Sequence, residues 1–277
     1  MMKNLLLFLC LWACASKQSQ TKQASSSKLP KLKIRYIANM GVFLHSTNAQ
    51  GESKKVLIDA LHQKYRPTYL YPDAALTRQM TQGISPFDKV NLALVTHIHA
   101  DHFGASVCAR QLRQNPATQL VGSGQIRDSL QKTNLYPQIK NQIKVATKAE
   151  SLTLNQVPIK ILPIAHTWAR RHGWVKNFGY IVDLYGKKVL HVGDAELSED
   201  LFKALALHQE RIDVAILPLW FVNSPQGKKL VKKYIRPKNI IATHISVGNE
   251  AQAFRQVKKY FPTAIVFTKS GEEWTLL

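Results

Sequence analysis

Cysteine is scarce in this sequence, with three residues among 277. Cys10 lies in an N-terminal apolar stretch that we expect to be removed, and Cys14 lies in a segment typical of lipid attachment, which would prevent it from pairing. Cys108 is then left without a partner and is expected to pack as a small buried hydrophobic side chain. A fold held together by disulfides is therefore excluded.

Acidic residues are also few: 17 Asp and Glu stand against 38 Lys and Arg, and the net charge is +21. None occurs before Glu52, and lysines cluster at 228–229 and 232–233. Such a charge favours an anionic partner: phospholipid headgroups, lipopolysaccharide, a phosphorylated substrate or nucleic acid, which the charge does not exclude. The alternative is a solvated basic surface without a specific partner. Charge alone does not choose between them.

The N-terminal apolar run, residues 4–12, is too short to span a bilayer. It follows Lys3 and has the form of a secretory signal peptide. The sequence L-W-A-C, which ends at Cys14, resembles the bacterial lipobox, although that pattern prefers a small residue at the position of Trp12. We predict a signal peptide over residues 1–13 and a lipid anchor on Cys14 as the first mature residue. The alternative is plain secretion after the A-C-A segment at 13–15.

Either cleavage predicts a protein of the cell envelope. Residue 15 is not Asp, which favours the outer membrane for a lipid-anchored form, whereas the unanchored form would be periplasmic or secreted. Residues 14–30 form a predicted flexible tether, since the polar stretch within them has no large apolar side chain to bury. Residues 31–277 are long enough for one domain with a sizeable core.

The most informative segment is T-H-I-H-A-D-H-F-G at 96–104, which places three histidines and an aspartate within six residues. All four are ligands for a borderline-soft divalent metal. In extended backbone His97 and His99 point the same way and can share one ion. A turn that begins at the segment 102–104 breaks the strand geometry and would let Asp101 and His102 reach a second ion. The segment therefore predicts both halves of a two-metal site.

The flanking sequence places this segment at the end of a strand. Residues 90–96 are mostly apolar and suit a buried strand, and residues 104–114 look helical. Ligand sites in open α/β sheets lie at the carboxyl ends of the strands.

The H-x-H-x-D-H motif after an apolar strand resembles the metallo-β-lactamase superfamily of metal-dependent hydrolases. The resemblance implies three further ligands at strand ends, and the sequence supplies His166, Asp194 and His244 in matching contexts. It implies one metal site of His97, His99 and His166, a second of Asp101, His102 and His244, and Asp194 bridging both. The fold that the resemblance implies is a four-layer αββα sandwich of the α/β class, in one domain.

Two Zn²⁺ ions are the expected cofactors, although Mn²⁺ or Fe²⁺ also suit such ligands. Di-iron relatives carry Glu at the position of His99, and several true β-lactamases use a Cys ligand that is absent here. Paired ions would hold a bridging hydroxide, because metal coordination lowers the pKa of water. The resemblance favours Asp101 as the catalytic carboxylate that receives the proton. Asp59, after the strand 55–59, is the candidate acceptor for the ring N–H of a metal-bound histidine.

The remaining elements are predicted from periodicity and breakers. Strands are expected near 33–37, 42–46, 55–59, 90–96, 118–122, 157–165, 178–184, 187–192, 212–217, 239–243 and 263–267. Helices are expected near 73–82, 104–114, 123–132, 198–208, 226–234 and 249–260. The insertion 60–83 could line the mouth of the cleft.

Substrate-binding candidates follow the late motifs. Directly after His166 the chain carries Trp168, Arg170, Arg171, His172 and Trp174, and a loop that leaves a metal ligand must pass near the active site. The arginines could clamp a phosphate or carboxylate, the tryptophans could form an apolar wall, and His172 could act as a general acid. The alternative is a solvent-facing loop. Trp220 is a second candidate wall, with core packing as its alternative.

Three functions remain open from the sequence. The first is a binuclear zinc hydrolase of a phosphodiester or phospholipid-like substrate, favoured by the basic residues after His166. The second is the same metal site acting on a carbonyl substrate, such as a lactone or a β-lactam. The third is a non-catalytic envelope protein that binds metal or lipid.

Overall fold

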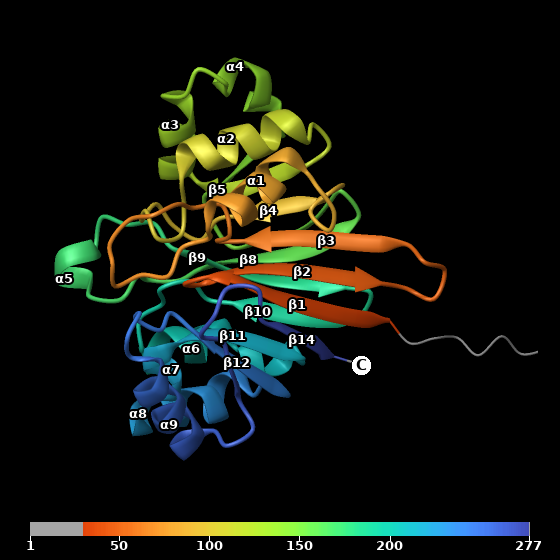
Figure 1. Cartoon of the computed structure of the whole chain (residues 1–277). Coiled ribbons are helices and arrows are strands. Elements are labelled where there is room, and N and C mark those ends of the chain that lie inside the picture. The colour runs from red at the N-terminus through yellow and green to blue at the C-terminus, as the bar shows by residue number, and fades with distance from the viewer. Residues whose placement is uncertain (1–29, 277) are drawn as a thin grey trace, which may run out of the picture.

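The computed structural model describes residues 30–276, which form two β-sheets packed face to face with helices on both outer surfaces (Figure 1). The predicted four-layer αββα sandwich is confirmed. The predicted signal peptide, the Cys14 anchor and all but the last residue of the tether lie outside the described residues and stay predictions. Within residues 30–276 no helix has the length and apolar character needed to cross a membrane.

Each sheet has seven strands. The first sheet has the order β14 (Glu273–Leu276), β1 (Lys31–Ala38), β2 (Gly41–Thr47), β3 (Ser53–Ile58), β4 (Leu92–Leu94), β5 (Gln119–Ser123), β6 (Ile143–Ala146). The second has the order β13 (Ile265–Val266), β12 (Asn239–Thr243), β11 (Val214–Pro218), β10 (Lys187–His191), β9 (Phe178–Leu184), β8 (Val157–Pro163), β7 (Glu150–Leu154).

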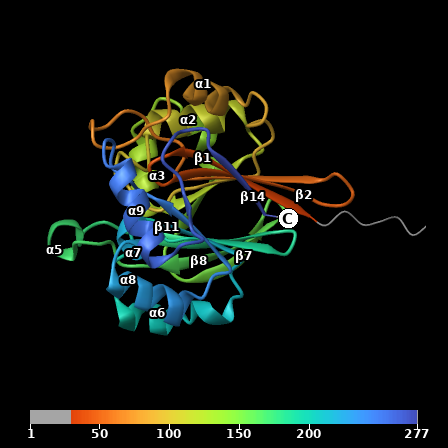
Figure 2. The same ribbon diagram turned by 60° about the horizontal axis from the view of Figure 1, so that its bottom comes forward.

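The helices divide between the two outer layers (Figures 1 and 2). The first sheet is covered by α1 (Ala74–Gln82), α2 (Ala105–Gln114), α3 (Gly124–Gln131), α4 (Tyr136–Ile139) and the 3-10 turn η1 (Lys140–Gln142). The second is covered by α6 (Glu199–Leu205), η2 (Leu207–Gln209), α7 (Leu219–Val222), α8 (Pro225–Leu230), the π-helical η3 (Val231–Ile235) and α9 (Glu250–Tyr260). The short helix α5 (Ala169–His172) belongs to neither layer and projects from one end of the sandwich.

The alternation of apolar residues in the strands builds the central layer of the core. In β1, Leu32, Ile34 and Tyr36 are fully buried and face the second sheet, while the residues between them are more exposed. They meet Val182 and Val214 from β9 and β11 in one apolar cluster. Burying each aliphatic side chain contributes about 1.5–3 kcal/mol, so this layer fixes how the two sheets, and hence the strand ends, lie opposite each other.

Helix packing completes the other two layers. Val107 and Leu112 of α2 pack with Leu120 of β5 under the first outer layer, and Phe202 of α6 packs with Phe221 of α7 under the second. Cys108 is fully buried in α2 and has no disulfide partner among residues 30–276, in agreement with the predicted packing role.

Three strands and three short helices were not predicted from the sequence: β6, β7, β14, α4, α5 and α7. β7 and β14 lie at sheet edges and alternate between exposed and half-buried residues, so their own hydrophobic pattern is weak. β14 forms because residues 273–276 pair with β1, more than 230 positions earlier in the chain. Local periodicity does not carry that information.

Candidate metal centre

Four candidate ligands come from the turn that joins β4 to α2. The backbone N–H groups of His102 and Phe103 both donate to the carbonyl oxygen of His99, at 3.0 and 2.9 Å, so the chain reverses there. The N–H of Gly104 then donates to Leu61 at 2.8 Å, which fixes the start of α2. After this reversal Asp101 and His102 group with His244, while the His102 ring also lies 4.0 Å from that of His97.

The other three ligands follow strands of the second sheet. His166 lies three residues after β8 and pairs with Ala195 in an isolated β-bridge. Asp194 follows β10, and His244 directly follows β12 with a positive φ of 58°. Both are interior strands whose last three residues are buried, so the ligands that follow them are held by the core and not by a free loop.

Gly193 positions the Asp194 carboxylate. Its φ is +59°, and a Cβ there would lie 2.5 Å from the Asn177 Oδ1 and 2.7 Å from the Thr96 Cβ. His191, expected to be a buried core histidine, accepts from the N–H of Gly193 at 3.2 Å. Its other ring nitrogen bonds the Met40 carbonyl at 3.0 Å. Only a glycine fits this turn, because both the backbone angle and the space exclude a side chain.

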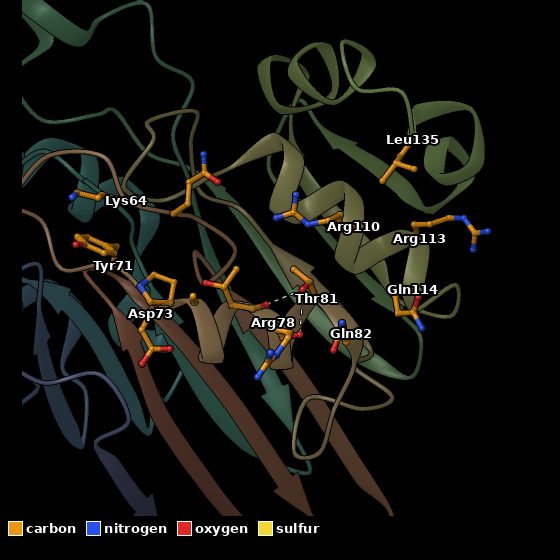
Figure 3. Close-up of a pocket in the computed structure, with 14 residues that line it drawn as sticks. Lys64, Tyr71, Asp73, Arg78, Thr81, Gln82, Arg110, Arg113, Gln114 and Leu135 are labelled. Carbon is orange, nitrogen blue, oxygen red and sulfur yellow. Dashed lines mark hydrogen bonds between the residues drawn. The ribbon is translucent and has the colours of Figure 1, made fainter.

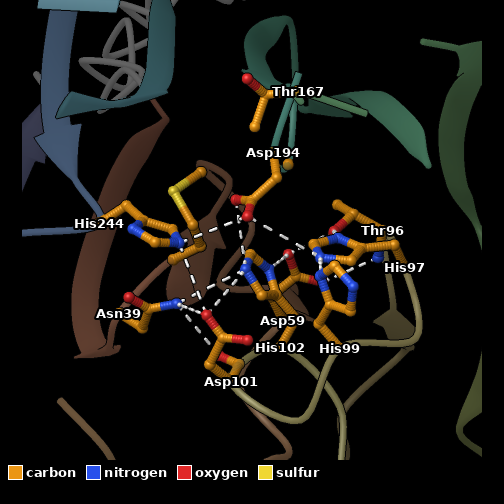
Figure 4. Close-up of polar contacts among 12 residues, drawn as sticks. Asn39, Asp59, Thr96, His97, His99, Asp101, His102, Thr167, Asp194 and His244 are labelled. Carbon is orange, nitrogen blue, oxygen red and sulfur yellow. Dashed lines mark hydrogen bonds and ion pairs between the residues drawn. The ribbon is translucent and has the colours of Figure 1, made fainter. Parts of the chain in front are cut away.

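The seven side chains fall into two groups, and within each group the ligand atoms lie within 4.8 Å of one another. The first group is His97, His99, His166 and Asp194, and the second is Asp101, His102 and His244. Asp194 lies between the groups (Figure 4). Its Oδ2 is 3.7 Å from His166 Nε2 and 3.4 Å from His244 Nε2, and its Oδ1 is 3.2 Å from His102 Nε2. Two groups of candidate ligands are therefore brought together, and their occupation by two ions stays a prediction.

The donor atoms of this cluster fit divalent cations. His166 Nε2, Asp194 Oδ1 and His244 Nε2 are buried and have no hydrogen-bond partner among residues 30–276. Buried polar atoms are nearly always satisfied, so these atoms point to ions as their partners. Imidazole nitrogens and carboxylate oxygens suit zinc, and also manganese or iron. The number and identity of the ions stay predictions.

Asp59 lies behind His102, where the sequence predicted an acceptor for a metal-bound histidine. It is fully buried, and its Oδ2 accepts from His102 Nδ1 at 2.8 Å and from the Thr96 hydroxyl at 2.6 Å (Figure 4). Its Oδ1 accepts from the Thr96 N–H at 2.8 Å. With the proton held on Nδ1, the Nε2 lone pair of His102 faces the ligand cluster.

Asn39, which the sequence analysis missed, contacts two of the candidate ligands. It is fully buried in the turn between β1 and β2, and its Nδ2 donates to Asp101 Oδ2 at 3.0 Å and to the Asp101 carbonyl at 3.3 Å. Its own carbonyl accepts from the N–H of His244 at 3.0 Å. Asn39 therefore orients two ligands of the second group. In the sequence it reads as an ordinary turn residue, because its partners are 62 and 205 positions away.

The protein field around the cluster is strongly negative on the side of the second group. Burial opposes a charge on His102, but the carboxylates of Asp194 and Asp101 outweigh it and raise the His102 pKa well above its usual range. Burial would also raise the pKa of Asp101, yet His102 and His244 lower it to about 2. Burial lowers the pKa of His99 to about 4, with His166 adding to the effect. Metal binding requires neutral imidazoles, so an ion held by the second group would have to displace the proton that these carboxylates favour on His102.

A cleft of about 530 Å³ opens over the ligands and is lined by residues from several elements. Trp168, Arg171 and His172 form one wall, and the His172 ring lies 4.7 Å from that of His99 and 5.0 Å from that of His166. Trp220 forms another wall, with its Nε1 donating to the Ala195 carbonyl at 2.9 Å.

Two of the substrate-binding candidates lie outside the cleft lining. Arg170 is exposed and does not line the cleft, unlike its neighbour Arg171. Trp174 also lies outside the lining, with its ring 6.1 Å from that of His99.

The insertion 60–83 reaches the mouth of the cleft through Tyr65, Arg66 and Tyr69, which the sequence did not single out. A larger groove of about 680 Å³ lies on the outer helical layer between α1 and α2 (Figure 3). None of the seven candidate ligands lines it, so the chemistry of the described residues is concentrated in the smaller cleft.

Comparison with known proteins agrees with this geometry. The family described as the beta-lactamase superfamily domain matches residues 54–268. A metal-dependent hydrolase of Thermus thermophilus is 24% identical over 192 residues, which cover 61% of this chain and 73% of that protein.

Two solved structures share the fold. The metallo-β-lactamase fold protein YhfI from Bacillus subtilis matches with a TM-score of 0.59 and 16% identity, over 90% of this chain and all of that one. Zn²⁺-bound PqqB from Methylobacterium extorquens matches with a TM-score of 0.55 and 12% identity, over 89% and 99% of the two chains. Since the family model spans well over half of the sequence, this chain belongs to the metallo-β-lactamase superfamily.

Proposed function

We propose that this protein is a metal-dependent hydrolase that uses two zinc ions to cleave an anionic ester, with phosphodiesters, including phospholipid-like ones, as the substrate class. One observation supports the proposal above all: seven candidate metal ligands lie together beneath a cleft, and Arg66 and Arg171 line the same cleft. Its curated relatives, named metal-dependent hydrolases, support the general reaction class.

Each side chain of the two ligand groups has a role in the proposed reaction. His97, His99 and His166 would hold one ion and His102 and His244 would help to hold the other, with Asp194 shared between them. When bound, such an ion pair supplies a water of lowered pKa and stabilises developing negative charge. The Asp101 carboxylate, ionised at neutral pH and lining the cleft, would accept the proton of the attacking water. The amide of Asn39 keeps that carboxylate in place.

The cleft walls favour an anionic substrate with an apolar portion. Arg66 and Arg171 enter from different segments, and neither has an ion pair with a carboxylate within residues 30–276. Guanidinium groups bind phosphate oxygens bidentately. Trp168, Trp220 and Tyr69 supply apolar surface on the same cleft. A neutral lactone or lactam would need no such pair of cations.

Metal content and substrate choice test the proposal. Purified protein should contain about two zinc ions per chain, and zero or one would refute the binuclear centre. Bis(p-nitrophenyl) phosphate should be turned over, whereas nitrocefin and a simple lactone should not. Turnover of the lactone or nitrocefin alone would establish the carbonyl alternative. Absence of turnover with a full metal complement would favour the non-catalytic alternative.

Variants separate the roles of the side chains. Asp101→Ala should lose at least about 100-fold in kcat, the usual size of a general acid–base contribution. Arg171→Gln should raise KM for the phosphodiester and leave the zinc content unchanged. Arg78→Gln, which removes a similar exposed arginine from the groove between α1 and α2, is the matched control. Wild-type activity in Asp101→Ala would sink the mechanism.

A further inference from the structure

A ring of exposed aromatic and basic side chains surrounds the mouth of the cleft. We call it the mouth rim and define it as Tyr65, Arg66, Trp168, Arg170, Arg171 and Trp174. We propose that the mouth rim docks this protein on a lipid bilayer that carries anionic headgroups. The proposal goes beyond hydrolysis, because a docking surface can be tested and can fail without any measurement of turnover.

The aromatic residues of the rim are unusually exposed. Trp168 is 70% exposed, Trp174 59% and Tyr65 46%. Within residues 30–276 only six large apolar side chains are exposed to this degree. Two of these three, Tyr65 and Trp168, line the cleft, and Trp174 lies beside it, with its ring 6.1 Å from that of the cleft residue His99. Clustered apolar exposure marks an interaction surface, while isolated exposed residues are ordinary. Tryptophan and tyrosine are the side chains that favour the interface between water and lipid.

The segment that carries the two tryptophans is a projecting loop with a fixed base. Figures 1 and 2 both show α5 extending beyond the sandwich. The Thr167 N–H donates to the Asp194 carbonyl at 2.7 Å, and Gln125 of α3 holds the other end through the Trp174 carbonyl at 3.0 Å and the Lys176 N–H at 2.9 Å. The loop is therefore held out from the body, with its indole rings exposed to solvent.

The charges of the rim complement an anionic surface. Arg66, Arg170 and Arg171 have no ion pair within the part of the chain that the structure describes, and Arg66 lies over the Tyr65 ring at 5.0 Å. Basic residues near a bilayer are attracted by its negative surface potential. The chain as a whole carries a net charge of +21, so long-range attraction acts in the same direction.

A bilayer fits this arrangement better than a nucleic acid. Single strands stack their bases on aromatic rings along a continuous basic groove. Here the exposed rings occur on two separate segments on either side of a concave opening. A flat, fluid surface can contact both segments at once.

The mouth rim and the predicted lipid anchor would attach the domain to a membrane from opposite ends. β1 begins at the end of the sandwich opposite α5 (Figures 1 and 2), so the predicted tether joins the domain far from the mouth rim. Docking through the rim would place the cleft directly over headgroups. The lipid on Cys14 must therefore be removed from any test of the rim.

The first experiment measures whether vesicle binding depends on charge. Full-length chains that carry Cys14→Ser are mixed with vesicles of phosphatidylcholine alone or with phosphatidylglycerol, and bound protein is sedimented. Binding should require phosphatidylglycerol and fall with salt. Arg66→Gln/Arg170→Gln should weaken partitioning by about 25-fold, or about fivefold for each arginine. Arg78→Gln/Arg110→Gln, with the same loss of charge in the groove of Figure 3, should change it by less than about twofold.

The second experiment locates the contact. Brominated lipids should quench the fluorescence of the bound chain, and Trp168→Ala/Trp174→Ala should lose most of that quenching and bind more weakly. Phe254→Ala, which removes another exposed aromatic residue (48%) from α9, should behave as wild type.

Equal losses in rim and groove variants, or unchanged binding in both rim variants, would overturn the proposal. So would tight binding to a single-stranded oligonucleotide without binding to vesicles. Unchanged thermal melting of the variants excludes misfolding as the cause of weaker binding.

Discussion

Replacement of Asp59 by Asn tests whether the ligand cluster depends on the buried carboxylate behind it. In the native protein Asp59 Oδ2 accepts two hydrogen bonds, from His102 Nδ1 and the Thr96 hydroxyl. An asparagine has almost the same shape, and its oxygen can still accept from the Thr96 N–H. Its amide group then faces His102 as a donor. His102 must accept on Nδ1 and carry its proton on Nε2, the nitrogen that faces the ligands.

The expected effect is a loss of metal affinity, largest in the second group. Removal of an outer partner of a ligating histidine weakens metal binding by about 10–100-fold, or roughly 1.4–2.7 kcal/mol. The first group is coupled to Asp59 more weakly, since His97 reaches it only through the Thr96 hydroxyl, 3.0 Å from His97 Nδ1. One ion should therefore dissociate at a higher free zinc concentration than in wild type, and the other should change little.

Zinc titration against a chelating indicator measures both affinities, and turnover against free zinc gives a second reading. The matched control is Asp213→Asn, which changes another buried carboxylate that accepts from the Lys188 N–H at 2.8 Å, far from the candidate ligands. It should leave both affinities unchanged. The reasoning is refuted if Asp59→Asn binds two ions as tightly as wild type, or if Asp213→Asn weakens binding to the same extent.

Two further substitutions test the frame of the site. Gly193→Ala should lower the free energy of unfolding by about 3 kcal/mol, because its Cβ would meet Thr96 and Asn177 at a positive φ. The control Gly186→Ala, also at a positive φ but with free space around it, should lower it by about 1 kcal/mol. Equal losses for the two variants in urea denaturation would contradict the packing argument. Burial, assisted by the charge of His102, lowers the pKa of His62 to about 4, so the unfolded chain binds this proton more tightly than the folded chain does. As pH falls from 6.5 to 4, His62 alone should remove about 3 kcal/mol from the free energy of unfolding of the metal-free protein. His62→Gln should make the pH dependence shallower by that amount in urea titrations with chelator present.

Strongly periodic segments explain why much of the fold could be predicted. The six predicted helices and the interior strands have apolar residues at regular spacing, and a buried face requires that pattern wherever the element lies. β14 and β7 show the limit. They are edge strands whose pairing partners decide their conformation, and their local sequence is compatible with a loop.

The ligand types were predictable for a different reason. Metal chemistry restricts them to His, Asp, Glu and Cys, and the spacing in 97–102 indicates a metal by itself. The resemblance to the metallo-β-lactamase superfamily then implied His166, Asp194 and His244. Asn39 and Arg66 were not predictable in this way. An amide that orients a carboxylate and an arginine at the cleft mouth have no required spacing, and the contacts that give them a role form only when β1 and the insertion 60–83 pack beside the cluster.

The sequence by itself carried the H-x-H-x-D-H segment and most of the strands and helices, because these depend on residue types and periodicities that the chain holds locally. The late ligands and the order of the layers followed from the superfamily resemblance of those motifs. Tertiary structure alone decided which histidine Asp59 holds and that Asn39 orients Asp101. It also decided that Arg171 lines the cleft while Arg170 faces solvent, and that Trp168 lines the cleft while Trp174 lies outside the lining. Those relations join residues tens to hundreds of positions apart, and only the packing of the two sheets sets the distances between them.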